Sequence, residues 1–257
     1  MSKYKKIEIH AGHWKALNSG AVGILNEVTE NRRVGHRVYE ILKASNVPVT
    51  YYEDNVSKNQ RENINHLVKH HNADQGGLIV SFHFNSSGAT TNKALGTEVL
   101  YSTQKALAEK LSKAISEATG GGLLNRGAKF RNDLGVLTKT IEPAILPEIC
   151  FVNSTVDAAI YRRDFEKICQ AVAAVLAAEI GYTVKEPVAV DASGINSPAL
   201  KAETELTLGS AARRKMIIDF AINQGANESW RTKLEKRTIT DEEIQALAMK
   251  AIVDFSK

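Results

Sequence analysis

Apolar and polar positions over residues 1–183 follow two different periods, which predicts strands interleaved with helices. Ile7 and Ile9 alternate with polar neighbours in a short strand over residues 6–10, and Gly12 is expected to turn the chain sharply after that strand. Further strands are predicted within 47–53, 76–87, 96–102, 135–137 and 142–154. Apolar residues recur at helical spacing within 27–44, 58–72, 104–120 and 164–181. This alternation indicates an α/β fold with a mixed, largely parallel sheet and helices on both faces.

The pattern changes after residue 183, which predicts a second domain. Residues 184–201 hold two of the five prolines and have no helical period, so we expect a linker there. Residues 202–257 show helical spacing, and Thr240 precedes an acidic first turn as a helix N-cap. The expected organisation is an α/β domain over 1–183, a linker over 184–201 and a small α-helical domain over 202–257.

Four polar residues stand where a parallel sheet places its ligands. His13 follows the first strand, His83 and Glu148 each end an apolar run, and Glu27 opens the first helix. Because the carboxyl ends of parallel strands meet at one rim, these side chains are expected to lie together. Two imidazoles and a carboxylate form an open zinc site, and a second carboxylate can take a proton from water there. Taken singly, each residue is more simply explained as a hydrogen-bonded histidine or a helix-dipole partner.

Short motifs around these residues carry a resemblance to a known family. They are I-x-x-G-H at 9–13, S-G-A and N-E within 19–27, H-x-N at 83–85, G-x-E-V-L-Y at 96–101, N-R-G-A-K at 125–129 and P-A-I-L-x-E at 143–148. Their order and spacing resemble the zinc-dependent N-acetylmuramoyl-L-alanine amidases, in the form found in bacteriophage endolysins, over residues 5–182. The family often reads Asp-Pro-Gly-His at the first ligand, where this chain has His-Ala-Gly-His at 10–13.

The resemblance implies that His13, Glu27 and His83 bind one Zn²⁺ per chain and that Glu148 is the catalytic carboxylate. It implies a peptidoglycan hydrolase that cleaves the amide bond between N-acetylmuramic acid and L-alanine by zinc-activated water. Two alternatives remain open, namely another zinc amidohydrolase or carboxypeptidase, and a non-catalytic wall-binding protein. In endolysins a second domain at this place commonly binds the wall, so the C-terminal helices are expected to bind wall polymers; an oligomerisation appendage is the plainer alternative.

Four further residues are candidates for supporting or substrate-binding roles. His10 lies near the metal ligands, and Asn85 is expected to brace the end of the strand that carries His83. Trp14 and Arg126 are candidates for bordering the glycan or peptide, and Arg126 would also be the group to grip a free carboxylate in a carboxypeptidase.

The histidines at 66, 70 and 71 and the two cysteines are not expected to take part in the metal site. His66 and His70 have the spacing of a metalloprotease helix, but Leu67 stands where that motif has glutamate. With His71 beside them, a solvated helix face is the expectation. Cys150 and Cys169 lie in apolar contexts and are expected to be buried free thiols.

Composition narrows the possible partners. The net charge of +4 is mild and suits an anionic wall, and no basic stripe with interleaved aromatic residues points to nucleic acid. No apolar run approaches the ~20 residues of a membrane span. The N-terminal residues MSKYKKIEIH lack the pattern of a secretory signal. The expectation is synthesis in the cytoplasm, followed by action on the wall after release through a holin.

Overall fold

The computed structural model describes residues 4–185, 211–223, 227–236, 238–240, 243, 244 and 247. The chain forms two compact units, residues 1–185 and 186–257. All but the first two residues of the predicted linker, 184–201, lie outside the described residues. The boundaries of the α/β domain, the linker and the helical domain drawn from the sequence stay predictions.

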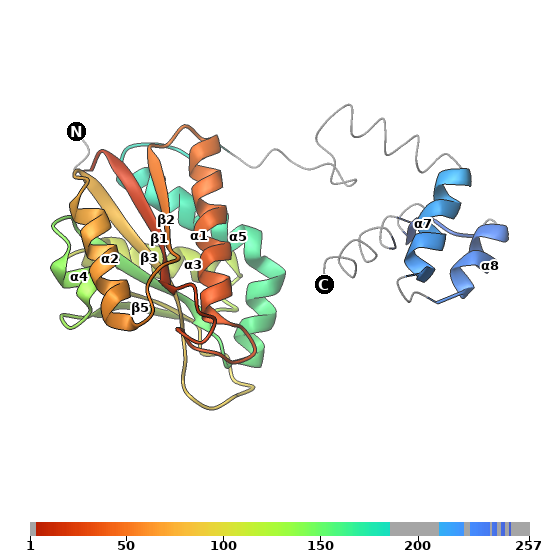
Figure 1. Ribbon diagram of the computed structural model, residues 1–257, viewed down its shortest axis with the longest axis horizontal. Helices are drawn as coiled ribbons and strands as arrows, with labels where there is room; N and C mark the ends of the chain where they lie inside the picture. The colour runs from red at the N-terminus through yellow and green to blue at the C-terminus, as the bar shows by residue number, and fades with distance from the viewer. Residues whose placement is uncertain are drawn as a thin grey trace. The chain divides into compact units, whose positions relative to one another are not determined.

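The first unit is built on one six-stranded sheet in the order β2-β1-β3-β6-β4-β5 (Figure 1). Strands β1, β2, β3 and β6 run in the same direction, whereas β4 is antiparallel to β6 and parallel to β5. The strands are β1 (Lys6–Trp14), β2 (Val49–Asp54), β3 (Gly77–Asn85), β4 (Thr97–Tyr101), β5 (Asn125–Phe130) and β6 (Ala144–Phe151). The predicted mixed, largely parallel α/β sheet is therefore confirmed.

Helices cover both faces of this sheet, as predicted. Helices α1 (Glu27–Ala44), α3 (Lys105–Ala118) and α5 (Thr155–Glu179) contact one another or the strands on one face, and α2 (Gln60–Asn72) and α4 (Gly135–Lys139) pack on the other. Side chains of a strand alternate between the faces. The larger core cluster contains Ile7, Ile9, Val80, Phe82, Ile145 and Ile149, and the smaller one contains Leu67, Ile79, Leu100, Val136, Ala144 and Leu146.

Two local predictions were wrong. The segment expected to be a strand over 135–137 is the short helix α4, whose Val136 and Leu137 are buried in the smaller core cluster. A single apolar turn is too short for its period to be recognised. The strand in this region is instead β5, where the sequence predicted a loop, because its largely exposed residues show no apolar alternation.

Helix α5 begins nine residues before its predicted start at 164. Ser154 caps it by accepting a hydrogen bond from the Asp157 backbone N–H. Asp164 has non-helical angles (φ −107°, ψ 18°), so the helix is kinked at the residue where the sequence pattern placed its start. The kink changes which residues face the core, and the apolar period of the whole helix is correspondingly weak.

The second unit contains two described helices, α7 (Ala211–Asn223) and α8 (Ser229–Glu235). A small apolar cluster holds Ile218, Ala221, Ile239, Ile244 and Leu247. Thr240 Oγ1 accepts from the Glu243 backbone N–H (3.2 Å), and Glu243 Oε2 accepts from the Thr240 backbone N–H (3.1 Å). This reciprocal pair is a capping box, and it agrees with the N-cap expected at Thr240.

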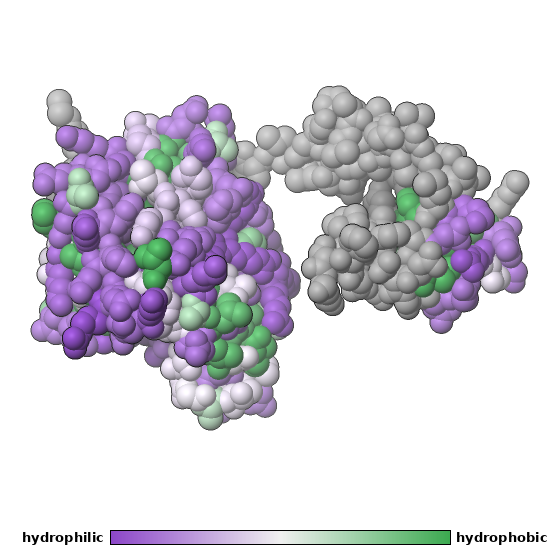
Figure 2. All heavy atoms as spheres, viewed as in Figure 1, coloured by the Kyte–Doolittle hydropathy of each residue, from purple (hydrophilic) through white to green (hydrophobic). Residues whose placement is uncertain are grey.

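The visible face of the first unit is mostly hydrophilic, with small apolar areas (Figure 2). Among the described helices, none combines the length and the apolar character that a membrane crossing requires. Cys150 and Cys169 are free and buried, as predicted. The exposed large apolar side chains are Leu17, Val22, Val56, Leu124, Phe130, Ile141 and Tyr182.

A buried chain of polar side chains joins β1 to α2. His71 Nδ1 lies 2.7 Å from Glu8 Oε2, and His71 Nε2 lies 2.8 Å from His10 Nδ1. Lys6 Nζ lies 3.1 Å from Glu8 Oε1 at the outer end. Since Glu8 and His10 alternate with the core residues Ile7 and Ile9, they point to the α2 face of the sheet. His71, which stands beside the two histidines expected on a solvated face, is instead buried and only 1% exposed.

The donors and acceptors among these buried side chains follow from the ionised carboxylate of Glu8. Burial alone would raise the pKa of Glu8, but the hydrogen bonds from His71 and Lys6 outweigh burial and lower it. Glu8 therefore accepts from His71 Nδ1–H, and His71 Nε2 and His10 Nδ1 share the next hydrogen bond. His10 Nε2 is buried without a hydrogen-bond partner in the described residues.

His10 is expected to make folding stability fall with acidification. Burial, together with the nearby histidines, lowers the pKa of His10 well below its ordinary value of 6.5. In the unfolded chain His10 takes up a proton near pH 6.5, whereas the folded chain resists it. Its contribution to stability is therefore complete above pH 6.5 and is lost as pH falls toward the folded pKa, by at most about 1.4 kcal/mol per pH unit.

This is measured by urea unfolding between pH 7 and pH 5. His10→Asn cannot bind the proton, so its free energy of unfolding should fall less steeply with acidification than that of the wild type. The control is His36→Asn, which replaces an exposed imidazole on α1 and should keep the wild-type slope. Identical slopes for wild type and His10→Asn would contradict the assignment.

Candidate metal centre

The carboxyl ends of β1, β3 and β6 meet at one rim of the sheet, as the sequence predicted. Cα register pairs His83 on β3 with Glu148 on β6, and His13 lies at the end of β1. Glu27 is the first residue of α1, which Asn26 caps by accepting from the Thr29 backbone N–H. The four residues predicted from strand ends and a helix start are thus held by four separate elements.

One oxygen of Glu27 lies between the two imidazoles. Glu27 Oε1 is 3.0 Å from His13 Nε2 and 2.9 Å from His83 Nδ1, and it also accepts from the Phe84 backbone N–H (3.1 Å). Glu27 Oε2 accepts from the Ala21 backbone N–H (2.7 Å). Both carboxylate oxygens are therefore fixed, and the residue as a whole is only 4% exposed.

These three side chains fit a metal ion. One donor atom from each of His13, Glu27 and His83 lies within 4.8 Å of the other two. Tetrahedral ligands of zinc at ~2.0–2.1 Å from the ion stand a little over 3 Å apart, so a small outward movement of the rings would admit it. Two imidazoles and one carboxylate are a donor set that zinc accepts, with a fourth position open.

Electrostatics keeps Glu27 ionised. Burial alone would raise its pKa, but the hydrogen bonds from His13 and His83 outweigh burial, and the pKa is lowered. For His83, burial lowers the pKa more than the hydrogen bond to Glu27 raises it. An ionised carboxylate beside a neutral imidazole is the protonation state that a metal ion requires.

The first strand runs further than the sequence predicted. It continues through Gly12 to Trp14, with irregular pairing to β2 between His10 and Trp14. The residue with left-handed backbone is His13 (φ 64°), not Gly12. Such an angle is uncommon for a residue with a side chain. It breaks the strand alternation and lets the His13 ring reach Glu27.

Position 12 has no room for a side chain. A Cβ on Gly12 would lie 2.3 Å from Nε2 of His83, so the ring occupies the space where a side chain would be. A Cβ on Gly20 would lie 2.9 Å from Glu27 Oε2 and 2.9 Å from His13 Cδ2. Two glycines therefore let backbone approach the three donor side chains closely.

Glu148 faces the same rim with an unused oxygen. Its Oε2 is buried and has no hydrogen-bond partner in the described residues. Removal from water, followed by the negative charges of Glu27 and Glu98, raises the pKa of Glu148 well above its ordinary value. A bound cation would oppose that shift. Such a carboxyl can exchange a proton with a group within hydrogen-bond distance of it.

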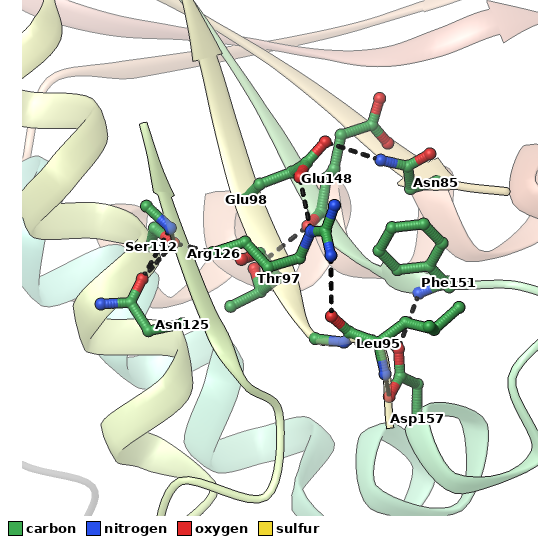
Figure 3. Close-up of polar contacts among 12 residues, drawn as sticks. Asn85, Leu95, Thr97, Glu98, Ser112, Asn125, Arg126, Glu148, Phe151 and Asp157 are labelled. Carbon is green, nitrogen blue, oxygen red and sulfur yellow. Dashed lines mark hydrogen bonds and ion pairs between the residues drawn. The ribbon is translucent and has the colours of Figure 1, made fainter. Parts of the chain in front are cut away.

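Glu98 lies next to Glu148, and the sequence analysis assigned it no role. Glu98 on β4 pairs in register with Glu148. Its Oε1 accepts from Asn85 Nδ2 (2.8 Å), and its Oε2 accepts from Arg126 Nε (2.6 Å) (Figure 3). The missed signal was an acidic residue inside the otherwise buried strand T-E-V-L, at 97–100. A buried charge of this kind needs partners.

The other candidate residues are placed as follows. His10 belongs to the buried chain with Glu8 and lies outside the group of three donors. Asn85, at the end of β3, donates to Glu98 on β4, so its contact reaches across the intervening strand β6. Trp14 is partly exposed at the end of β1, and its carbonyl accepts from Ser19 Oγ (2.9 Å). His66 bonds Ser57 Oγ through Nδ1 (2.8 Å), away from the donors.

Comparisons with known proteins agree with this geometry. Residues 7–178 match the family model described as N-acetylmuramoyl-L-alanine amidase. Two uncharacterized proteins of Clostridium perfringens are 34% identical over 163 residues (61% of this chain, 47% of that protein) and 31% identical over 196 residues (74% and 55%). The chain thus spans about half the length of the curated relatives it matches.

Solved structures share the fold. The catalytic domain of the CD27L endolysin targeting Clostridia difficile superposes with a TM-score of 0.58 at 23% identity, covering 67% of this chain and 97% of that domain. The catalytic domain of CwlV, an N-acetylmuramoyl-L-alanine amidase from Bacillus (Paenibacillus) polymyxa var. colistinus, gives a TM-score of 0.54 at 28% identity, covering 65% and 94%.

Gly12→Ala is expected to disrupt the donor group. The new methyl group would displace the His83 ring, so we expect at least about a tenfold loss in zinc affinity. Losses of this size are typical when the residues that orient a metal ligand are changed. Zinc affinity is measured by competition with a chromophoric chelator.

The matched control is Gly122→Ala, where the atoms nearest to the new Cβ are the terminal methyl of Ile160 and the Thr119 carbonyl oxygen, both at 3.2 Å. That variant should bind zinc as the wild type does. Unchanged affinity in Gly12→Ala would show that His83 does not need this space.

Proposed function

The chain belongs to the N-acetylmuramoyl-L-alanine amidase family, and from this membership we propose that it hydrolyses the amide bond between N-acetylmuramic acid and L-alanine in peptidoglycan. One zinc ion is the proposed cofactor, with His13, Glu27 and His83 as its ligands. The observation that carries the proposal is the single Glu27 oxygen held between two imidazole nitrogens, with the unpartnered oxygen of Glu148 at the same rim.

Bound zinc would supply a Lewis acid that polarises the scissile carbonyl and makes a water molecule more acidic. The protein supplies the fixed geometry around it. Glu27 is anchored by two backbone N–H groups, from Ala21 and Phe84, so neither imidazole has to order it on binding. Such preorganisation lowers the cost of reaching the transition state.

Glu148 is the proposed proton carrier. Its unpartnered Oε2 accepts a proton from the attacking water, and the raised pKa of the carboxyl makes it a competent base and then an acid. The same carboxyl then returns the proton to the nitrogen of L-alanine as the amide bond breaks. One residue therefore serves both half-steps.

We further propose that the protein acts as an endolysin and that the C-terminal helices bind wall polymers. The support is the order of the family motifs along residues 5–182, the shared fold with the CD27L endolysin catalytic domain, and a second compact unit after residue 185.

Digestion of purified peptidoglycan tests the bond and the metal together. We expect fragments with new N-terminal L-alanine on intact stem peptides, detected by mass spectrometry. Activity should disappear with EDTA and return with added zinc. Cleavage at another bond would favour a different zinc amidohydrolase or carboxypeptidase, and intact wall under every condition would favour a binding protein.

Glu148→Gln is expected to separate chemistry from metal binding. The amide cannot take a proton from water, so turnover should fall by at least about 10²-fold, the scale of general acid–base catalysis. Zinc content, measured by atomic emission, should remain one ion per chain because the three donor residues are untouched.

The control is Glu117→Gln on the exposed face of α3, which should leave turnover unchanged. Wild-type turnover in Glu148→Gln would remove this residue from the mechanism.

A further inference from the structure

We propose that Arg126 binds a carboxylate on the peptide part of the substrate, beside the scissile amide, and thereby selects peptides with a free carboxylate over amidated ones. This inference rests on the proposed function. It names a recognition group that the amidase assignment itself does not require.

Arg126 is held on three sides. Its Nε donates to Glu98 Oε2 at 2.6 Å, and its Nη1 lies 3.5 Å from the Leu95 carbonyl oxygen. The guanidinium carbon stands 5.1 Å from the centre of the Phe151 ring. Figure 3 shows the guanidinium between the Glu98 carboxylate and the Phe151 ring. The planar group therefore has one orientation, and a ligand would not have to order it.

Glu98, which holds Arg126, is itself held in place by hydrogen bonds. Glu98 is 7% exposed, and its second oxygen accepts from Asn85 Nδ2 at 2.8 Å. The side-chain oxygen Oδ1 of Asn85 in turn accepts from the Ser86 backbone N–H at 2.7 Å. Glu98 thus offers no free oxygen that would compete for the rest of the guanidinium.

Hydrogen-bond donors of Arg126 remain for a ligand. Of its five N–H groups, the two on Nη2 have no partner in the described part of the chain, and the side chain is 40% exposed. A bidentate contact takes one N–H from each of two guanidinium nitrogens, so Nη2 and the remaining N–H of Nη1 would meet the two oxygens of a carboxylate. Arg126 is therefore oriented by its contacts and open enough to be reached.

The location of Arg126 is next to the proposed chemistry. Glu98 and Glu148 are register partners on adjacent antiparallel strands, whose paired residues lie only ~4.5–5.5 Å apart. Phe151, which the guanidinium covers, is on the same strand as Glu148. A group bound by Arg126 thus belongs to a substrate whose amide lies beside Glu148.

The chemistry of the substrate indicates which group this is. The carboxyl group of muramic acid is consumed in the scissile amide, so the remaining carboxylates belong to the peptide. Because the Arg126–Glu98 pair is neutral as a unit, it attracts anions weakly at long range. It instead favours a group that accepts two hydrogen bonds at close range, which a carboxylate does better than a carboxamide.

The test compares two soluble substrates that differ at one group. Both are N-acetylmuramoyl-L-alanyl-γ-D-glutamyl methylamide; one keeps the α-carboxylate and the other carries a carboxamide there. Each is used as a competitive inhibitor of peptidoglycan digestion, and kcat and KM are measured where it is cleaved. We expect the wild type to favour the carboxylate by about tenfold, at the weak end for a charge-assisted pair because Arg126 is partly exposed.

Arg126→Gln should abolish this preference through KM or the inhibition constant, with little change in kcat, and Arg126→Lys should keep part of it. The matched control is Arg131→Gln. Arg131 is equally exposed at 41%, and Asp133 pairs with both its Nε and its Nη2 at 2.7 Å. The control should retain the wild-type preference.

Three results would overturn the inference: equal treatment of the two compounds by the wild type, a preference that survives in Arg126→Gln, or a preference lost equally in Arg131→Gln. Thermal unfolding of each variant shows whether a lost preference reflects loss of the fold. Failure of the wild type to release N-terminal L-alanine from peptidoglycan is a different outcome, because it would overturn the amidase proposal on which the inference rests.

Discussion

The carboxylate of Glu27 is the point on which the site depends. Its two oxygens meet two imidazoles and two backbone N–H groups, contributed by β1, β3, the end of β3 and the loop before α1. A buried carboxylate is costly unless every oxygen is paired, so each of these partners is required in place. This requirement explains the left-handed backbone at His13 and the absence of side chains at Gly12 and Gly20. The three side chains that could hold a metal ion are therefore joined in one hydrogen-bonded unit.

A second buried carboxylate, Glu8, supports the same strand from the other end. It is held by Lys6 and His71, and His71 holds His10, three residues before His13. These buried polar side chains join β1 to α2 through hydrogen bonds and ion pairs. At the family's usual aspartate position the chain has His10, and a histidine there has the reach to bond His71. The residue that departs from the family pattern, His10, is thus hydrogen-bonded to His71 on α2.

The direction of β4 and β5 decides what faces Glu148. Because these two strands run against β6, their first residues lie at the rim where β1, β3 and β6 end. Glu98 and Arg126, near the starts of β4 and β5, are thereby brought to the same rim as Glu148. A fully parallel sheet would have placed both residues at the opposite end, away from the donors. Mixed strand direction therefore decides which side chains lie around Glu148.

The sequence by itself determined the α/β class, the bounds of α1, the burial of both thiols and the four residues that meet at the rim. These features follow from local periods and from polar residues at strand and helix ends, which neighbouring residues suffice to specify. Only the tertiary structure decided that His71 is buried, that Glu98 lies at the site and pairs with Arg126, and that 135–139 is a helix. The partners concerned are far apart in the chain, 63 residues for Glu8 and His71 and 28 for Glu98 and Arg126. A local pattern reports whether a residue is compatible with burial, but the partner that pairs a buried charge, and the direction of the strand that brings it, are set by packing across the whole sheet.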